Sequence, residues 1–286
     1  MPSTSYHLHL PDEFTSCVVF ASPHSGRDYP WSFLRGTILD EHTIRSSEDA
    51  FVDRLFDCAP QFGAAFLRAG APRAYVDLNR ACDELDPALI DGVRKAGNNP
   101  RIASGLGVVP RVVANGRAIY RGKLPRSEAD KRITRIWRPY HDKLGELLVQ
   151  SRAQFGTSVL IDCHSMPHEA VRQSGKKGDL PQIVIGDRFG ASASSEIVER
   201  VEAAFAQAGL RVVRNAPFAG AFITQHYGRP SQNQHAIQIE IDRSIYMDEK
   251  TVRPNGNFHP FRKLLRGVVA ELAAIGPQQQ EQLAAE

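Results

Sequence analysis

The chain has 286 residues, of which 42% are hydrophobic and 23% are charged, and its formal net charge at pH 7 is +3. This composition is that of a globular protein and excludes disordered and fibrous classes. The charge is too weak, and Lys and Arg are too scattered, for a nucleic-acid surface. No apolar stretch approaches the roughly 18 residues of a membrane span, and the polar start up to Pro11 has no secretory signal. We therefore expect a cytoplasmic protein without membrane or nucleic-acid partners.

Short apolar runs and segments of helical spacing alternate along the chain. In chain order, the pattern predicts a strand at 17–21, a helix at 49–58, strands at 64–67 and 74–78, a helix from Ser127 to Leu148, strands at 158–162 and 182–186, a helix at 193–208, strands at 211–214 and 236–241, and a helix at 261–275. Pro139 lies inside the long helix and is expected to kink it, because proline lacks a backbone donor.

Strands that alternate with helices predict an α/β protein, with a mostly parallel sheet covered on both faces. We expect one domain over residues 1–286, with a polar tail from about residue 277. Two long loops are also expected, at 91–108 and 167–180. Loops of this length in a compact domain are often functional.

Polar clusters follow three of the predicted strands. His24 follows the run at 17–21, Asn79 and Arg80 follow the run at 74–78, and His164 follows the run at 158–162. Open α/β sheets bind their ligands beyond the carboxyl ends of the strands. We therefore expect these side chains at one edge of the sheet.

Two histidines at one sheet edge suggest a metal site. Neutral imidazole is a frequent zinc ligand, and Glu48 or Asp49 supplies a carboxylate nearby in sequence. Two His, one carboxylate and one water match an open catalytic zinc site. Taken singly, each residue is better explained as a turn or capping residue, with Asp49 as a helix N-cap. Taken together, they favour a metal.

Glu240 stands among isoleucines in the strand predicted at 236–241. An unpaired carboxylate there costs several kcal/mol. Either Arg229 or Arg243 pairs with it, or it faces a cleft. In the second case, burial raises its pKa toward neutrality, which suits a general base.

Arginines are the third group of candidate residues. Guanidinium grips carboxylate with two parallel hydrogen bonds, so several arginines around a pocket select an anionic substrate. Because most arginines are surface groups, we expect about two of the four candidates to face the site. The candidates are Arg80, Arg121, Arg229 and Arg243.

These segments resemble the N-formylglutamate amidohydrolase family, and they occur in the family's order from about residue 17 to residue 250. A single short motif is weak support, whereas an ordered set is strong. The matching pieces are Pro23-His24-Ser25-Gly26, Glu48-Asp49-Ala50-Phe51-Val52-Asp53, Tyr75-Val76-Asp77-Leu78-Asn79-Arg80, Ile119-Tyr120-Arg121, Trp137-Arg138-Pro139-Tyr140-His141, Asp162-Cys163-His164-Ser165-Met166, the run 220–229, His235-Ala236-Ile237-Gln238-Ile239-Glu240 and Tyr246-Met247.

The resemblance implies a three-layer α/β/α sandwich with a mixed central sheet, similar to zinc-dependent exopeptidases of the phosphorylase/hydrolase-like fold. It implies Zn²⁺, or another divalent ion, held by His24, His164 and an acidic residue. Asp49 takes that place in the family pattern, and Glu48 is the alternative. Glu240 then takes the place of the catalytic glutamate.

The resemblance also implies a substrate pocket lined with polar and cationic groups. Arg121 or Arg80 would stabilise the developing oxyanion. His226 or His235 would assist, unless each is only a strand-end histidine. The substrate-binding residues that we expect are Asn79, Arg80, Tyr120, His226, Arg229 and Arg243.

The implied reaction is zinc-dependent hydrolysis of N-formyl-L-glutamate to formate and L-glutamate, an amide hydrolysis of histidine catabolism. The segment Phe218-Ala219-Gly220-Ala221-Phe222 lacks the basic residue and the second glycine of the family's histidine-degradation members. The acyl group and the amino acid therefore stay open. One alternative is a zinc deacylase or carboxypeptidase that acts on another N-acyl amino acid or a short peptide. Another is a non-catalytic protein that binds acidic metabolites.

Overall fold

The computed structural model describes residues 2, 4–94, 99–174 and 180–276, and its centre is a seven-stranded mixed sheet. In order across the sheet, the strands are β1 (Tyr6–His9), β3 (Ala65–Ala69), β2 (Val18–Ser22), β4 (Ser158–Met166), β7 (Gln234–Asp242), β5 (Ile183–Gly186) and β6 (Val212–Arg214). β3, β2, β4 and β7 are parallel to one another. β1 is antiparallel to β3, and β5 is antiparallel to β7. The predicted mostly parallel, mixed sheet is confirmed.

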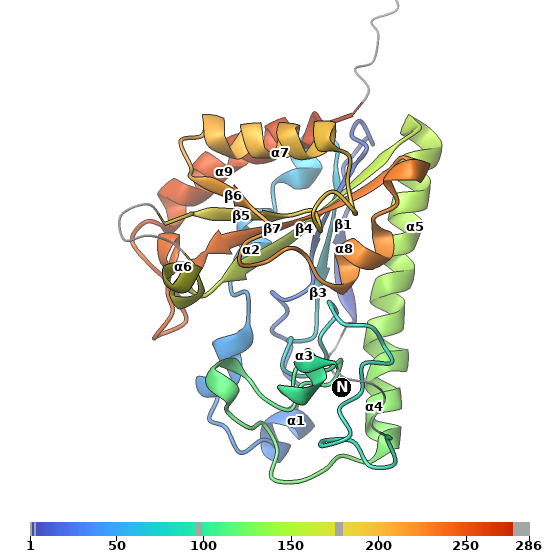
Figure 1. Ribbon diagram of the computed structural model, residues 1–286, viewed down its shortest axis with the longest axis vertical. Coiled ribbons are helices and arrows are strands. Elements are labelled where there is room, and N and C mark those ends of the chain that lie inside the picture. The colour runs from blue at the N-terminus through green and yellow to red at the C-terminus, as the bar shows by residue number, and fades with distance from the viewer. Residues whose placement is uncertain (1, 3, 95–98, 175–179, 277–286) are drawn as a thin grey trace, which may run out of the picture.

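Successive side chains of the strands enter two cores on opposite faces of the sheet. Val18 and Phe20 of β2 pack in one core, and Val19 and Ala21 pack in the other. The first core is covered by α2 (Val52–Leu55), α7 (Ser195–Gln207) and α9 (Phe258–Ala273), and the second by α5 (Arg138–Phe155) and α8 (Phe222–Tyr227). Figure 1 shows α7 and α9 paired along the top of the view and α5 as a long column at its right. The three-layer α/β/α architecture is confirmed.

The long helix predicted from Ser127 runs from α4 (Arg126–Arg132) through a π-helical turn at Ile133–Trp137 into α5. Pro139 follows this π turn directly, in the first turn of α5. The helix is continuous here, because Trp137 before α5 also has helical backbone angles, so Pro139 removes one backbone N–H from within the helical run. The irregularity expected at Pro139 is therefore a π turn just before it.

Residues 74–78, predicted as a strand, form a buried irregular segment instead. It starts with a turn in which the Pro72 carbonyl accepts the Tyr75 N–H, and Val76 and Leu78 are fully buried. Burial without strand pairing explains the apolar pattern. The prediction of a strand was wrong here because an apolar run reports burial and not sheet pairing.

The helix predicted at 49–58 is a single turn, α2, because Phe51 before it adopts a left-handed φ of 68°. The two predicted loops contain short helices, α3 (Pro100–Ala103) and α6 (His168–Ser174). The rest of the chain adds α1 (Trp31–Gly36) and a small ribbon of β8 (Met247–Asp248) and β9 (Arg253–Pro254).

Parts of both loops, 95–98 and 175–179, and the tail from 277 lie outside the described residues. Within the described residues, no helix is both long and apolar enough to cross a membrane.

Candidate active site

His24 and His164 meet at one edge of the sheet because β2 and β4 pair in parallel, with Ala21 opposite Asp162. Their Nδ1 atoms lie 3.1 Å apart. Asp49 Oδ2 lies 3.0 Å from Nδ1 of His164 and 3.5 Å from Nδ1 of His24. The Asp49 backbone N–H donates to the His24 carbonyl at 3.0 Å. Three donor atoms from distant parts of the chain thus converge on one point.

The other ring nitrogen of each histidine is held by a carboxylate. Asp77 Oδ1 lies 2.7 Å from Nε2 of His24, and Asp162 Oδ2 lies 3.0 Å from Nε2 of His164. An ionised carboxylate can only accept a hydrogen bond, so each Nε2 carries a proton, and Nδ1 is the nitrogen left to bind a metal or a second proton. Carboxylate–histidine pairs of this kind orient the ligands of protein-bound metals.

The three donor atoms fit a single cation. Tetrahedral ligands with bonds of about 2.0 Å lie about 3.3 Å apart, and the separations here are 3.0, 3.1 and 3.5 Å. Lone pairs this close repel one another unless a positive charge lies between them. Two imidazole nitrogens and one carboxylate oxygen are also the donor set of an open zinc site. His24, Asp49 and His164 therefore could hold a divalent ion.

The charges around these residues favour a cation. Burial disfavours the charged imidazole, but Asp162 and Asp49 outweigh it and raise the pKa of His164 well above its usual range. Burial likewise disfavours the Asp49 carboxylate, yet the two histidines and Arg243 hold the pKa of Asp49 well below its usual range. A bound metal replaces such a proton at its ligands.

Arg243 and Glu48 hold other positions than those expected. Arg243 Nη2 donates to Asp49 Oδ1 at 2.8 Å, so this guanidinium positions the acidic donor and is not free for substrate. Glu48 accepts hydrogen bonds from Tyr29 and Arg45 and is absent from the cluster of possible metal ligands. The alternative of Glu48 as the acidic ligand is therefore not supported.

Glu240 lies on β7 directly opposite His164 of β4 in the sheet register. Its Oε1 accepts a hydrogen bond from Gln238 Nε2 at 2.8 Å, and among the described residues it has no ion-pair partner. Burial, opposed by His164 and assisted by Asp49, raises the pKa of Glu240 to about 7. A buried carboxyl with this pKa can exchange a proton near neutrality.

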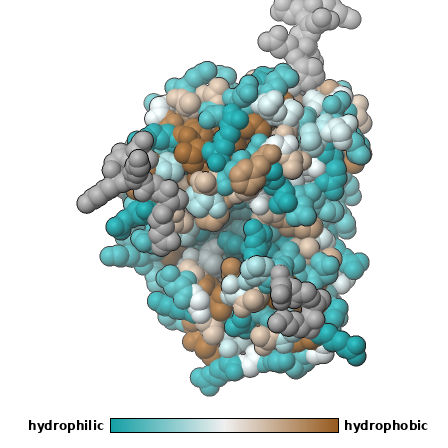
Figure 2. All heavy atoms as spheres, in the orientation of Figure 1, coloured by the Kyte–Doolittle hydropathy of each residue, from teal (hydrophilic) through white to brown (hydrophobic). Residues whose placement is uncertain are grey.

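These residues open into a cavity of about 720 Å³, which is in the range of small-molecule sites. The face in Figure 2 is hollowed between the sheet and the loops below it, with hydrophilic side chains around the hollow. The cavity walls outside the sheet edge come mainly from parts of segments 101–106, 110–116 and 217–221. Its charged lining residues are Asp49, Arg73, Asp77, Arg80, Arg101, Glu240 and Arg243.

Arg80 lines this cavity and is 6% exposed. Among the described residues, its Nε and Nη1 atoms have no hydrogen-bond partner. The backbone on either side of Asn79 is clamped by the long helix: His141 Nε2 donates to the Leu78 carbonyl at 2.9 Å, and Trp137 Nε1 donates to the Arg80 carbonyl at 2.8 Å. The Arg80 guanidinium is thus buried at the cavity wall on a fixed backbone, with hydrogen-bonding capacity that the described residues leave unused.

Asn79, expected to bind substrate, also lines the cavity but faces the His164 side of the site. Its Oδ1 accepts the Ile223 backbone N–H at 2.8 Å, which fixes the side-chain amide. Its Nδ2 lies 3.5 Å from Asp162 Oδ2 and 3.4 Å from Gln238 Oε1. Asn79 therefore links the carboxylate behind His164 to the strand that carries Glu240.

Four expected residues lie outside the cavity lining. Arg121 is exposed, and the Arg229 guanidinium donates to the backbone carbonyls of Gln225 and Gly228. Tyr120 accepts a hydrogen bond from Arg132, and His226 stacks on Phe222. His235 is likewise removed from the site, because its Nδ1 accepts the Ser194 N–H at the start of α7. In each case a local partner or solvent satisfies the side chain.

Several residues of the site were not predicted, namely Arg73, Asp77, Arg101, Asp162 and Gln238. Two of them had a signal in the sequence. Asp162 precedes His164 by two residues and Gln238 precedes Glu240 by two, so each pair shares one face of its strand. Asp77 had no such signal, because the segment that carries it is irregular.

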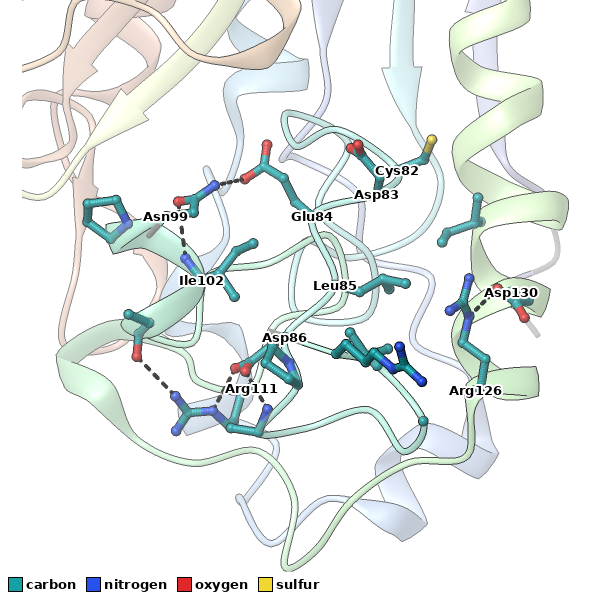
Figure 3. A pocket seen from close by; sticks show the side chains of 18 of the residues that line it. Cys82, Asp83, Glu84, Leu85, Asp86, Asn99, Ile102, Arg111, Arg126 and Asp130 are labelled. Carbon is teal, nitrogen blue, oxygen red and sulfur yellow. Dashed lines mark hydrogen bonds and ion pairs between the residues drawn. The ribbon is translucent and has the colours of Figure 1, made fainter. Parts of the chain in front are cut away.

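A second cavity of about 970 Å³ lies among the loops below the sheet (Figure 3). It is lined by parts of 82–94, by α3 and its surroundings, and by residues of α4 and the long helix. None of His24, Asp49, His164 and Glu240 lines it. Although it is the larger cavity, it therefore lacks the metal-ligand cluster.

Comparisons with known proteins point to one family. The family model described as N-formylglutamate amidohydrolase matches residues 16–247. The N-formylglutamate deformylase of Pseudomonas aeruginosa is 32% identical over 259 residues, which are 89% of this chain and 90% of that protein. The enzyme of the same name from Pseudomonas putida is 32% identical over 239 residues, 81% of this chain and 82% of that protein.

Experimental structures agree as well. The crystal structure of N-formylglutamate amidohydrolase from Ralstonia eutropha JMP134 has a TM-score of 0.87 and 33% identity, and the match covers 94% of this chain and 96% of that one. A gene product of Agrobacterium tumefaciens, only 15% identical with a TM-score of 0.66, shares the fold over 95% of this chain and 94% of its own. The resemblance seen in the sequence motifs is confirmed, and the chain belongs to the N-formylglutamate amidohydrolase family.

Proposed function

We propose that this chain is a metal-dependent amidohydrolase that cleaves N-formyl-L-glutamate to formate and L-glutamate. The observation that carries the proposal is the convergence of His24, Asp49 and His164 at one cavity with a buried Glu240 opposite them. The names of the two Pseudomonas relatives support formylglutamate as the substrate.

The donor set supports zinc, although another divalent ion could use the same atoms. His24, Asp49 and His164 would hold the ion, with Asp77, Asp162 and Arg243 fixing their orientation. When bound, such an ion polarises the amide carbonyl and makes water more acidic.

Glu240 is the proton carrier in this proposal. Its pKa of about 7 lets the carboxylate take a proton from the attacking water and return it to the amide nitrogen as the C–N bond breaks. Two exchanges by one group account for the protons of a hydrolysis.

Arg80 orients the substrate. Its side chain lines the cavity beside Asp77, and a guanidinium group can hold a carboxylate with two parallel hydrogen bonds. Fixing the carboxylate places the formyl carbon and restricts its motion before attack.

The test is metal analysis of the purified chain followed by a formate-release assay. We expect a stoichiometric divalent ion, release of formate from N-formyl-L-glutamate, loss of activity with a chelator and recovery with zinc. Faster cleavage of N-acetyl- or N-succinyl-glutamate, of N-formyl-aspartate or of a short peptide would change the proposed substrate. The proposed metal site would still stand. A chain without stoichiometric metal or turnover would be a binding protein, and the proposal would fail.

A further inference from the structure

Four guanidinium groups line the cavity of about 720 Å³ beside the donor cluster, here called the reaction cavity, and two of them have a carboxylate partner within 3.0 Å. Arg73 Nε lies 3.0 Å from Asp77 Oδ2, and Arg243 Nη2 lies 2.8 Å from Asp49 Oδ1. Arg80 comes no closer than 4.0 Å to the same Asp77 oxygen. Arg101 has no side-chain hydrogen bond or ion pair within the described part of the chain. Two positive groups are thus left for a ligand.

The Arg101 side chain extends from α3, which forms a wall between the two cavities. Arg101 and Ser104 line the reaction cavity, whereas Ile102 and Ala103 line the larger neighbouring cavity. In Figure 3 the Ile102 side chain points into that neighbouring cavity. Neighbouring residues of this segment therefore line different cavities. Arg101 is the residue of α3 that adds a positive charge to the reaction cavity.

The wall is anchored at both ends, as the dashed lines in Figure 3 show. At its start, Asn99 Oδ1 accepts the Ile102 backbone N–H at 3.4 Å, and Asn99 Nδ2 donates to Glu84 Oε2 at 3.2 Å. At its end, Arg111 Nη2 donates to the Ala103 carbonyl at 3.3 Å. Binding a ligand at Arg101 therefore requires ordering of its side chain and little ordering of the backbone.

The two free guanidinium groups influence each other. Burial lowers the pKa of Arg80, Asp77 opposes this effect, and Arg101 and Arg73 lower the pKa further. Like charges that share a cavity repel, and a ligand with two carboxylates would relieve the repulsion at both groups. A ligand with a single carboxylate leaves one of them unmatched.

The two arginines differ in depth. Arg80 is buried beside Asp77, and Asp77 is hydrogen-bonded to His24 of the donor cluster. Arg101 is exposed on α3. In an N-formyl dicarboxylic amino acid, the α-carboxylate is close to the reacting amide, and the side-chain carboxylate is farther along the carbon chain. Depth therefore assigns the α-carboxylate to Arg80.

Building on the function proposed above, we propose that Arg101 binds the side-chain carboxylate and selects acidic over neutral amino acids, whereas Arg80 binds the α-carboxylate of either kind. Arg101 is then a specificity residue, and its effect depends on the charge of the side chain of the substrate.

The test compares Arg101→Gln with Arg80→Gln on N-formyl-L-glutamate and N-formyl-L-glutamine, which have similar shapes and differ in side-chain charge. Arg101→Gln should lower kcat/KM for the glutamate substrate by ~10- to 100-fold and change it little for the glutamine substrate, because a charged hydrogen bond is lost with the first alone. Arg80→Gln should lower both. Arg126→Gln is the control, since Arg126 lines only the neighbouring cavity (Figure 3) and pairs with Asp130.

Calorimetric titration of N-formyl-L-glutamate and N-formyl-L-glutamine into the metal-loaded Glu240→Gln protein, with and without Arg101→Gln, gives a readout without turnover. We expect preferential binding of the glutamate compound, and loss of that preference with Arg101→Gln. Equal losses on both compounds, or no loss on either, would overturn the role of Arg101. Preferential binding without hydrolysis by the unmodified chain would instead refute the proposed reaction and leave the role of Arg101 intact.

Discussion

Asp162 and His164 lie two residues apart on β4, with the Asp162 carboxylate 3.0 Å from Nε2 of His164. Alternate residues of a strand share a face, so a single strand supplies both an imidazole of the donor cluster and the group that orients it. Gln238 and Glu240 repeat the relationship on the neighbouring β7. The sheet edge that carries the candidate active site is therefore built from two such pairs on adjacent parallel strands.

The first prediction concerns Asp162→Asn. An amide in place of the carboxylate removes the strong acceptor behind His164, and we expect metal affinity to fall by ~10- to 100-fold. Competition with a chromophoric chelator measures the change. Asp53→Asn serves as the control, because Asp53 is buried and pairs with Arg27 and Arg68. Equal metal affinities of the two variants would contradict the orienting role of Asp162.

The second prediction concerns Glu240→Gln. The substitution keeps the shape and the contact with Gln238 but removes the group that accepts a proton. We expect the bound metal to remain and kcat to fall by at least ~10²-fold. Single-turnover formate release and metal analysis on the same sample give the two quantities. Turnover close to that of the unmodified chain would exclude Glu240 as the base.

The third prediction is an acid limb in the pH dependence of kcat/KM. The active form of Glu240 is the carboxylate, so activity should fall as the pH drops through its pKa of about 7. A bound cation nearby would shift this limb to lower pH. The Glu240→Gln protein should lack the limb in its residual activity. An acid limb that survives the substitution must belong to another group.

The fourth prediction concerns Trp137→Phe. The change keeps an aromatic ring but removes the donor to the Arg80 carbonyl, which costs about 1 kcal/mol. Because this bond positions Arg80, we expect a several-fold higher KM with kcat and metal content nearly unchanged. Trp31→Phe is a matched control, since Trp31 is 71% exposed on α1. If Trp137→Phe lowered only the thermal stability and left KM unchanged, the role of Trp137 in positioning Arg80 would be excluded.

Much of the fold could be predicted from the sequence, because most buried strands are short, apolar and followed by turns or polar residues. Residues 158–162 and 236–241 were located well, although β4 and β7 extend further at their ends. β1 was not predicted, since its alternating His and apolar residues sit half-buried at a sheet edge. The prediction of a strand at 74–78 was wrong because this segment is buried without pairing to a strand.

The donor cluster could be predicted because strand ends gather at one edge of a parallel sheet. The arginines could not be sorted in this way. Arg229 binds backbone carbonyls next to it in sequence, Arg243 binds Asp49, and Arg121 faces solvent. Whether an arginine side chain faces the cavity depends on the path of the chain between the strands, for example on where α3 lies. That path is fixed by contacts between side chains distant in sequence, such as Asn99 and Glu84.

The spread of the site along the chain has a consequence for biosynthesis. The donors come from residues 24, 49 and 164 and the proposed proton carrier from residue 240, and the strand between β2 and β7 in the sheet is β4, which starts only at residue 158. A nascent polypeptide that has emerged up to the end of β3 has two donors but lacks the strand that aligns them. Pairings between segments so far apart form late, so catalytic competence reports that the polypeptide has been made and has folded at least as far as β7.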